Sequence, residues 1–183
     1  VCNLYPFQEV AQRGANIDEL LENIDIGGVT LIRAGAKNYP HVIILTDPLD
    51  YEQILEELDA EGNVTLLTRQ SLALKAFAHT AAYDGAIVEG LSSELGVEPE
   101  MKKELTIPLK KEQDLRYGEN PHQEAALYLP PMKKLPWVQL GGKPLSYNNI
   151  LDLDCAMRGA ALLQDGPGAL VIKHTTPCGM AYG

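Results

Sequence analysis

The chain has few basic residues compared with its acidic ones. Lysine and arginine number 15 against 25 aspartate and glutamate residues, which gives a formal net charge of −10. A protein that binds nucleic acid or a membrane surface broadly needs a basic face, so this balance argues against both kinds of partner. It does not exclude a small anionic substrate, because a few cationic side chains in one cleft can hold it.

Cysteine is also scarce. Cys2, Cys155 and Cys178 are odd in number and far apart, so a disulfide framework is not expected. They favour a reducing compartment, and we predict a cytoplasmic protein. We expect neither a signal peptide nor a membrane span. Because the chain opens on Val1 and stops at Gly183 just after a strand-to-loop transition, we expect an internal fragment of a longer protein.

The first half predicts an α/β fold. The run His41–Asp47 is rich in β-branched residues and lies between two prolines, which predicts a buried strand of a parallel sheet. Apolar spacing predicts helices over 17–24 with Asn16 as N-cap, from Gly27–Gly28 onward, over 48–61 and over 68–95. Strands and helices in alternation favour α/β layering.

The second half changes character after a polar, charged stretch. Two extended runs flank a turn-rich centre, a Gly-Pro-Asn loop leads into a helix, and a strand at 168–174 ends on a Lys-His pair. We therefore expect two domains, 1–95 and 114–183, joined by a linker at 96–113.

The Lys-His pair lies in "VIKHTTPCG", at the end of an expected parallel strand, where α/β sheets bind ligands. His174 can move a proton near neutral pH, and Lys173 can hold an anion or stabilise a developing oxyanion. A surface lysine beside a structural histidine explains the pair alone at least as well. Pro177 and Gly179 predict a fixed turn directly after the pair, and this favours a functional role.

Cys178 raises two alternatives, a zinc site and a cysteine nucleophile. Zinc nucleobase deaminases carry His-x-Glu and then Pro-Cys-x-x-Cys, whereas this chain lacks both the second cysteine and the upstream His-x-Glu. A hydrolytic zinc site therefore fails on ligand count, and we predict no metal. Apart from one nearby histidine, nothing marks Cys178 as an activated thiolate.

Two further clusters carry groups that suit an anion. In "DLRYGENPHQ", Arg116 offers a planar fork and Tyr117 a hydroxyl on a stacking ring, although a well-capped turn is the alternative. In "IDIGGVTLIRAGAKN", Gly27–Gly28 can open a helix with bare backbone amides. Asp25 and Lys37 flank that helix and can meet only if the helix and its entry loop bring them together.

Six stretches, taken in order, resemble one known family. They are "CNLYPF", "IDIGGVTLIRAGAKN", "LKAFAHTAAYD", "DLRYGENPHQ", "LSYNNILDLD" and "KHTTPCG". Together they closely resemble the bifunctional purine biosynthesis enzymes that join phosphoribosylaminoimidazolecarboxamide formyltransferase to IMP cyclohydrolase. The resemblance implies the end of a methylglyoxal-synthase-like cyclohydrolase domain, followed by the start of a cytidine-deaminase-like formyltransferase domain without zinc. It also implies that a Lys-Thr-Leu-His-Pro motif and most of the folate site lie outside this segment.

The resemblance implies two successive reactions. The 5-amino group of aminoimidazole carboxamide ribotide takes a formyl group from 10-formyltetrahydrofolate. The carboxamide nitrogen then attacks that formyl group, and loss of water closes the ring of IMP. It further implies a homodimer whose formyltransferase site is shared between subunits, so this fragment alone should be inactive.

The family's site positions can be carried onto this chain. For formyl transfer, the resemblance implies catalytic roles for Lys173 and His174 and substrate binding by Arg116, Tyr117 and Asn149. For ring closure, it implies catalytic roles for Tyr5, Asp25 and Lys37, and Asn3, Gly27 and Gly28 are expected to bind substrate. A zinc nucleobase deaminase-like enzyme and a non-catalytic nucleotide-binding module are the alternatives.

Overall fold

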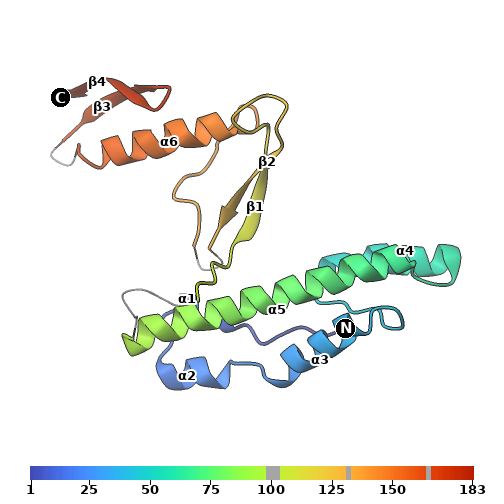
Figure 1. The fold of residues 1–183 in the computed structure, drawn as a ribbon. Coiled ribbons are helices and arrows are strands. Elements are labelled where there is room, and N and C mark those ends of the chain that lie inside the picture. The colour runs from blue at the N-terminus through green and yellow to red at the C-terminus, as the bar shows by residue number, and fades with distance from the viewer. Residues whose placement is uncertain (98–103, 131–132, 164–165) are drawn as a thin grey trace. The chain divides into compact units, whose positions relative to one another are not determined.

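The computed structural model describes residues 1–97, 104–130, 133–163 and 166–183. The chain forms two compact units, Val1–Leu109 with Pro130–Lys133, and Lys110–Leu129 with Lys134–Gly183. The first is helical, and the second contains two antiparallel hairpins and one helix (Figure 1). The linker expected at 96–113 includes residues 98–103, which lie outside the described residues. The boundaries of the two expected domains stay a prediction.

The first unit consists of short helices packed along one long helix. In chain order its elements are α1 (Phe7–Gln12), α2 (Ile17–Glu22), α3 (Gly27–Lys37), the 3-10 turn η1 (Pro48–Asp50), α4 (Tyr51–Glu61) and α5 (Leu66–Leu95). Local sequence sets their ends. The Asn16 side chain accepts a hydrogen bond from Glu19 N at 3.0 Å, as predicted for an N-cap. Gly62, at φ 66°, ends α4 in the left-handed region that glycine favours.

Helix α5 is the axis of the core in this unit, and α1, α2 and α3 all pack on it (Figure 1). Small residues let the helices approach closely, since a Cβ added at Gly90 would lie 3.1 Å from the Phe7 ring. Phe7 is fully buried and meets the ring of Tyr83 edge-on, with centroids 6.4 Å apart. This packing fixes α1 against α5.

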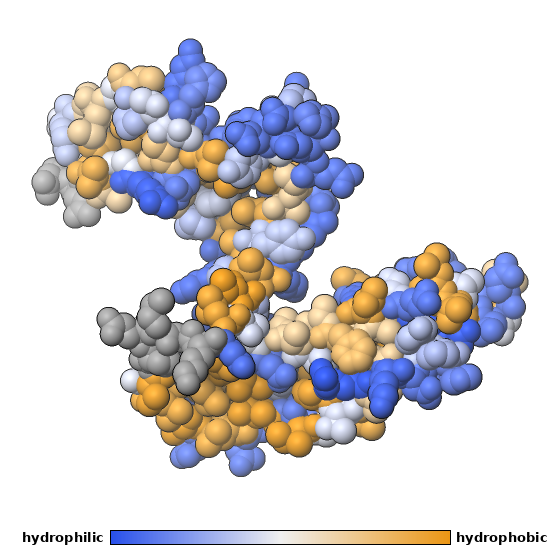
Figure 2. Space-filling view, viewed as in Figure 1, coloured by the Kyte–Doolittle hydropathy of each residue, from blue (hydrophilic) through white to orange (hydrophobic). Residues whose placement is uncertain are grey.

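Apolar side chains also reach the surface of the chain. Figure 2 shows apolar residues gathered over α2 and the neighbouring end of α5 on the visible face. Leu21 in α2 and Leu95 in α5 are both more than half exposed. Among the described residues, no helix is both long and apolar enough to cross a membrane.

The strand predicted at His41–Asp47 is wrong, because residues 42–47 form no strand ladder. Ile44, Leu45 and Thr46 are buried, as the β-branched run suggested. A backbone hydrogen bond from Cys2 N to Leu45 O at 2.9 Å ties this segment to the start of the chain. A ladder needs repeated bonds to a neighbouring strand, and burial of apolar side chains alone does not supply them.

The second unit holds the strands of the described chain. They are β1 (Lys110–Leu115), β2 (Ala125–Leu129), β3 (Gly168–Lys173) and β4 (Thr176–Tyr182), with α6 (Tyr147–Ala160) between the two hairpins. The two extended runs, the helix and the strand ending on the Lys-His pair are confirmed. The mixed α and β content is also confirmed. The parallel sheet is wrong for the described residues, because β1 pairs with β2, and β3 with β4, in antiparallel fashion.

The turn after the Lys-His pair lies earlier than predicted. Pro177 and Gly179 belong to β4, and the chain reverses at His174 and Thr175, which have φ of 50° and 60°. The register pairs Lys173 with Thr176, so the two residues between them form the whole hairpin connection. Two-residue hairpin connections favour residues at positive φ, because turns built from them match the twist of the two strands.

Candidate functional site

In the first unit, the start of the chain lies between α3 and the η1–α4 turn. The Cys2 thiol lies 3.7 Å from the Gly28 carbonyl oxygen, and the Tyr51 hydroxyl donates to Asn3 Oδ1 at 3.2 Å. Asn3 and Tyr5 are exposed, and Tyr5 retains 56% of its accessible surface. The structure therefore brings the "CNLYPF" segment to the N-terminal end of α3. This is required if Asn3 and Tyr5 are to share a site with Asp25.

Asp25 is fixed at that helix end by two hydrogen bonds of its own and by a third that anchors its partner Tyr83. Its Oδ1 accepts a hydrogen bond from Gly28 N at 2.6 Å. Its own N–H donates to the Tyr83 hydroxyl at 2.9 Å, and that hydroxyl donates to Asn23 O at 3.0 Å. The bare amides expected at Gly27–Gly28 are thus not all bare, because the Asp25 carboxylate occupies the Gly28 amide.

Gly28 is required by this contact. A Cβ at that position would lie 2.5 Å from Asp25 Oδ2, closer than real Cβ atoms approach. The glycine therefore serves the close approach of Asp25 to the helix. Its expected role in binding substrate stays a prediction.

Lys37 lies at the opposite end of α3 from Asp25. The helix runs from Gly27 to Lys37, a rise of about 15 Å at 1.5 Å per residue. The condition under which Asp25 and Lys37 could meet is therefore not fulfilled, because the length of the helix separates them. Lys37 instead borders a groove of about 500 Å³ between α3 and α5, whose other lining residues are Ala36, Tyr39, Gln70, Ala73, Leu74 and Phe77. A cation beside this mostly apolar wall suits a planar ligand that carries negative charge.

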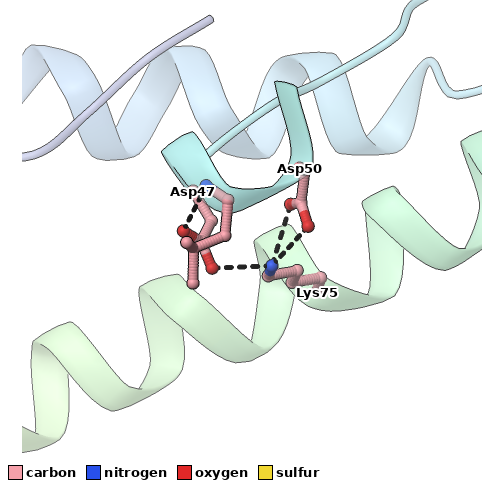
Figure 3. A network of polar contacts seen from close by, with 4 residues as sticks. Asp47, Asp50 and Lys75 are labelled. Carbon is pink, nitrogen blue, oxygen red and sulfur yellow. Dashed lines mark hydrogen bonds and ion pairs between the residues drawn. The ribbon is translucent and has the colours of Figure 1, made fainter. Parts of the chain in front are cut away.

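An ion network that the sequence did not reveal joins η1 to α5 (Figure 3). Lys75 Nζ lies 2.7 Å from Asp47 Oδ2 and 2.8 Å from both carboxylate oxygens of Asp50. Burial lowers the pKa of Lys75, but the hydrogen bonds and charges of the two aspartates outweigh it, so its pKa is raised. The network holds the turn that carries Tyr51, the partner of Asn3.

Lys75, His79 and Tyr83 lie four residues apart, so they share one face of α5. Burial raises the pKa of the Tyr83 hydroxyl, which keeps it protonated for the bond it donates. The spacing is visible in "LKAFAHTAAYD", and a search for polar residues at helical period would have found it. This stripe supports both the Asp47–Asp50 turn and the Asp25 loop.

The half-buried His79 makes stability sensitive to pH. Burial lowers the pKa of His79, partly offset by the charge of Asp47, while Lys75 lowers it further. The unfolded chain therefore takes up a proton near pH 6.5 that the folded chain resists, so stability is present above that pH and is lost as pH falls through it.

We expect the free energy of unfolding to fall between pH 7.5 and 5.5 through this group, because the folded chain binds the proton less readily than the unfolded chain. Urea unfolding of the wild type and of His79→Asn at both pH values measures it, and the variant should lose that part of the slope. His41→Asn, at an exposed histidine, is the matched control. A slope that is identical in wild type and His79→Asn would contradict the assignment.

In the second unit, the loop that carries Arg116 and Tyr117 docks on the start of α6. Arg116 N donates to Leu145 O at 2.7 Å, and Tyr147 N donates to Tyr117 O at 3.0 Å. The Arg116 guanidinium stacks 4.8 Å from the Tyr117 ring centroid. The loop is thus a well-capped turn, and it also displays an exposed guanidinium on an aromatic ring.

Asn149 forms part of the N-terminal cap of α6. Its Oδ1 accepts from Ser146 N at 3.0 Å, while Asn149 N donates to Ser146 Oγ at 3.3 Å. This reciprocal pair is a capping box, and it explains the asparagine structurally. Its expected contact with substrate stays a prediction.

Lys173 and His174 are exposed at the tip of the β3–β4 hairpin. In the described chain, the non-glycine residues at positive φ are His174 and Thr175. This conformation costs roughly 1–2 kcal/mol for each residue that is not glycine. Strained backbones of this kind concentrate at functional sites.

Helix α6 brings the two clusters of this unit together. Asn148 Nδ2 donates to Glu119 O in the first loop at 3.2 Å, and Thr175 N donates to Asp152 Oδ1 at 2.7 Å. Asn148 and Asp152 are four residues apart, about 6 Å along the axis, and therefore share one face. The Arg116 loop and the Lys173–His174 hairpin are thus hydrogen-bonded to successive turns of the same helix, α6.

The zinc-site and cysteine-nucleophile alternatives gain no support from the geometry of the described residues. In the part of the chain that is described, no three His, Cys, Asp or Glu side chains gather as metal ligands would. Cys178 is exposed, and its thiol lies 3.6 Å from Thr176 O.

Comparison with known proteins shows which family the chain belongs to. Residues 35–183 match the model of the AICARFT/IMPCHase bienzyme family. The chain belongs to this family. It is 45% identical to the bifunctional purine biosynthesis protein PurH of Persephonella marina and 47% identical to those of Halalkalibacterium halodurans and Aquifex aeolicus.

These matches cover 98% of the chain for the first relative and 100% for the other two. The chain spans only 36% of the length of each relative. Family membership, inferred from six short stretches, is therefore confirmed, and so is the expectation that the chain corresponds to part of a PurH-like protein.

Proposed function

We propose that the protein containing this chain carries out the last two steps of IMP synthesis. The observation that supports this most is that the Arg116 loop and the Lys173–His174 turn are both hydrogen-bonded to α6. The chain that shows this arrangement belongs to the AICARFT/IMPCHase family. A stacked guanidinium and an exposed Lys-His pair, both on segments bonded to α6, would supply an anion-binding group and a base. Transfer of a formyl group to an amine on a phosphorylated substrate needs both.

For formyl transfer, Arg116 and Tyr117 would bind the ribotide and orient its 5-amino group. That aromatic amine is a weak nucleophile, so its proton has to leave as it attacks the formyl carbon of the folate. His174 would accept this proton, and Lys173 would stabilise negative charge on the formyl oxygen or the departing folate nitrogen. Asn149 would keep α6 capped and contact the ribotide.

For ring closure, the first unit would supply the residues. Tyr5 and Asn3 lie on the segment that meets the N-terminal end of α3, where Asp25 is held. Lys37 would polarise the formyl oxygen as the carboxamide nitrogen attacks, and water would then leave. Holding the two reacting groups in contact would supply much of the acceleration. Because Asp25 and Lys37 lie at opposite ends of α3, they would act on different parts of the substrate.

The family's folate-type co-substrate would be 10-formyltetrahydrofolate, and neither step would need a metal. We propose a cytoplasmic homodimer with nucleotide and folate as its small-molecule partners, and neither nucleic acid nor a membrane surface among them. The apolar side chains of Val171 and Met180 on the β3–β4 hairpin, 60% and 55% exposed, are compatible with a subunit contact there.

An assay of the complete gene product tests the proposed function. With the aminoimidazole ribotide and 10-formyltetrahydrofolate it should form IMP, and with the formylated ribotide alone it should form IMP without folate. Binding of ribotide without any product would instead identify a nucleotide-binding module. Activity that requires stoichiometric zinc and releases ammonia would identify a deaminase.

A further inference from the structure

Two side chains of α6 hold both backbone groups of Thr175. The Asp152 carboxylate accepts from Thr175 N at 2.7 Å, and the Cys155 thiol lies 3.1 Å from the Thr175 carbonyl oxygen, to which it donates. Asp152 and Cys155 are three residues apart and share one face of the helix. Together they bind the amide nitrogen and the carbonyl oxygen of the same residue, Thr175.

That peptide position lies in the strained part of the hairpin. Thr175 is β-branched and has φ of 60°, a conformation that such residues rarely adopt without support. The connection also lacks the Asn-Gly or Gly-Gly pair that two-residue hairpins favour. The local sequence therefore does not select this turn, and contacts from another element have to hold it.

The turn determines where the Lys173–His174 pair points. Hydroxyl groups of Thr175 and Thr176 both donate to His174 O, at 2.6 and 3.3 Å, so the carbonyl of His174 is fixed as well. A relaxed backbone at Thr175 would rotate the adjoining peptide and move the imidazole. The α6 contacts thus set the position of His174 relative to the Arg116 loop, which the same helix carries.

We propose that Asp152 and Cys155 are positioning residues for formyl transfer, which fix the Thr175 backbone so that His174 and Lys173 face the substrate bound by the Arg116 loop. The inference rests on the proposed function of this pair. Neither side chain exchanges a proton with substrate. Both act through hydrogen bonds to one residue of the turn.

The test uses the complete protein and two paired substitutions. Asp152→Ala removes the acceptor, whereas Asp152→Asn keeps an oxygen at the same place. Cys155→Ala removes the thiol donor, whereas Cys155→Ser keeps a donor. Asp154→Ala is the control, because the exposed Asp154 on the same helix pairs with Arg158 at 2.9 Å and does not contact the turn.

Two readouts are needed, the exchange of backbone amide hydrogens in peptides covering 173–178 and the kinetics of formyl transfer. Asp152→Ala should speed exchange at Thr175 and lower kcat roughly 10- to 100-fold, since misplacement by about 1 Å has such effects. KM for the ribotide should change less than about threefold, because the Arg116 loop is untouched. Asp152→Asn and Cys155→Ser should recover most of the loss, and Cys155→Ala should show a smaller loss in the same direction.

Contrary results are distinct. Faster exchange at Thr175 with unchanged kcat would overturn the positioning role and leave the proposed function intact. Equal losses in Asp152→Asn and Asp152→Ala would also overturn it, because the acceptor would not be the feature that matters. A wild-type protein that transfers no formyl group would overturn the proposed function instead. If Asp152→Ala does not fold, the Cys155 pair gives the same comparison.

Discussion

Replacing His174 by asparagine in the complete protein is expected to lower kcat for formyl transfer about 10³-fold, the middle of the range for loss of a general base. Asparagine tolerates the left-handed backbone that His174 adopts, at φ 50°, so the turn should survive while the base is lost. Binding of the ribotide should be largely kept, since Arg116 and Tyr117 are unchanged. Steady-state kinetics and ribotide titration of the same preparation measure both effects.

His174→Ala separates the base from the backbone. Alanine loses the same imidazole but fits the left-handed region less well, so it should be at least as impaired and should also loosen the hairpin. His41→Asn, in the other compact unit, should leave turnover unchanged. Unchanged turnover in His174→Asn would remove His174 from the mechanism, whatever the alanine variant shows.

Replacing Lys37 by alanine is expected to slow ring closure about 10²-fold, as loss of one oxyanion-stabilising group does in other enzymes. Formyl transfer should stay within about twofold of wild type, because Lys37 and His174 lie in different compact units of the chain. Turnover of the formylated ribotide measures the first activity, and the folate-dependent step measures the second. Lys37 is exposed beside its groove, so the substitution should cost little stability.

Lys37→Arg keeps the charge and should recover part of the ring-closure rate, and Lys134→Ala, at an exposed lysine of the other unit, should have no effect. If Lys37→Ala reduces both activities equally, the damage is to folding or assembly, and the assignment of Lys37 to ring closure fails. A loss confined to KM would show that Lys37 binds substrate without stabilising charge in the transition state.

Most helices of the described chain could be predicted from local sequence because their signals are local, whereas α1 (Phe7–Gln12) was not predicted. The apolar spacing after Asn16, the Gly27–Gly28 pair and the glycine at position 62 each act within a few residues, and the structure confirms the elements they mark. Family membership was also recoverable, since short stretches in fixed order carry it.

Strand pairing was not predictable in this way. The apolar run at 41–47 predicted burial correctly, but a ladder depends on a partner far away in the sequence. Likewise, "VIKHTTPCG" predicted a strand before the Lys-His pair but not that Pro177 and Gly179 return along it as β4. The register of two segments is a tertiary property, because it depends on which backbone groups each strand finds.

For the candidate sites too, the sequence identified the residues and the structure determined their positions. Sequence alone identified the residue types for an anion site and a base, among them Arg116, Lys173 and His174, since these follow from side-chain chemistry. Only the tertiary structure decided that Tyr51 donates a hydrogen bond to Asn3, and that Asp152 of α6 holds the turn beside His174. Chemical capability belongs to single residues, but distance and orientation depend on contacts between segments that the linear sequence keeps apart.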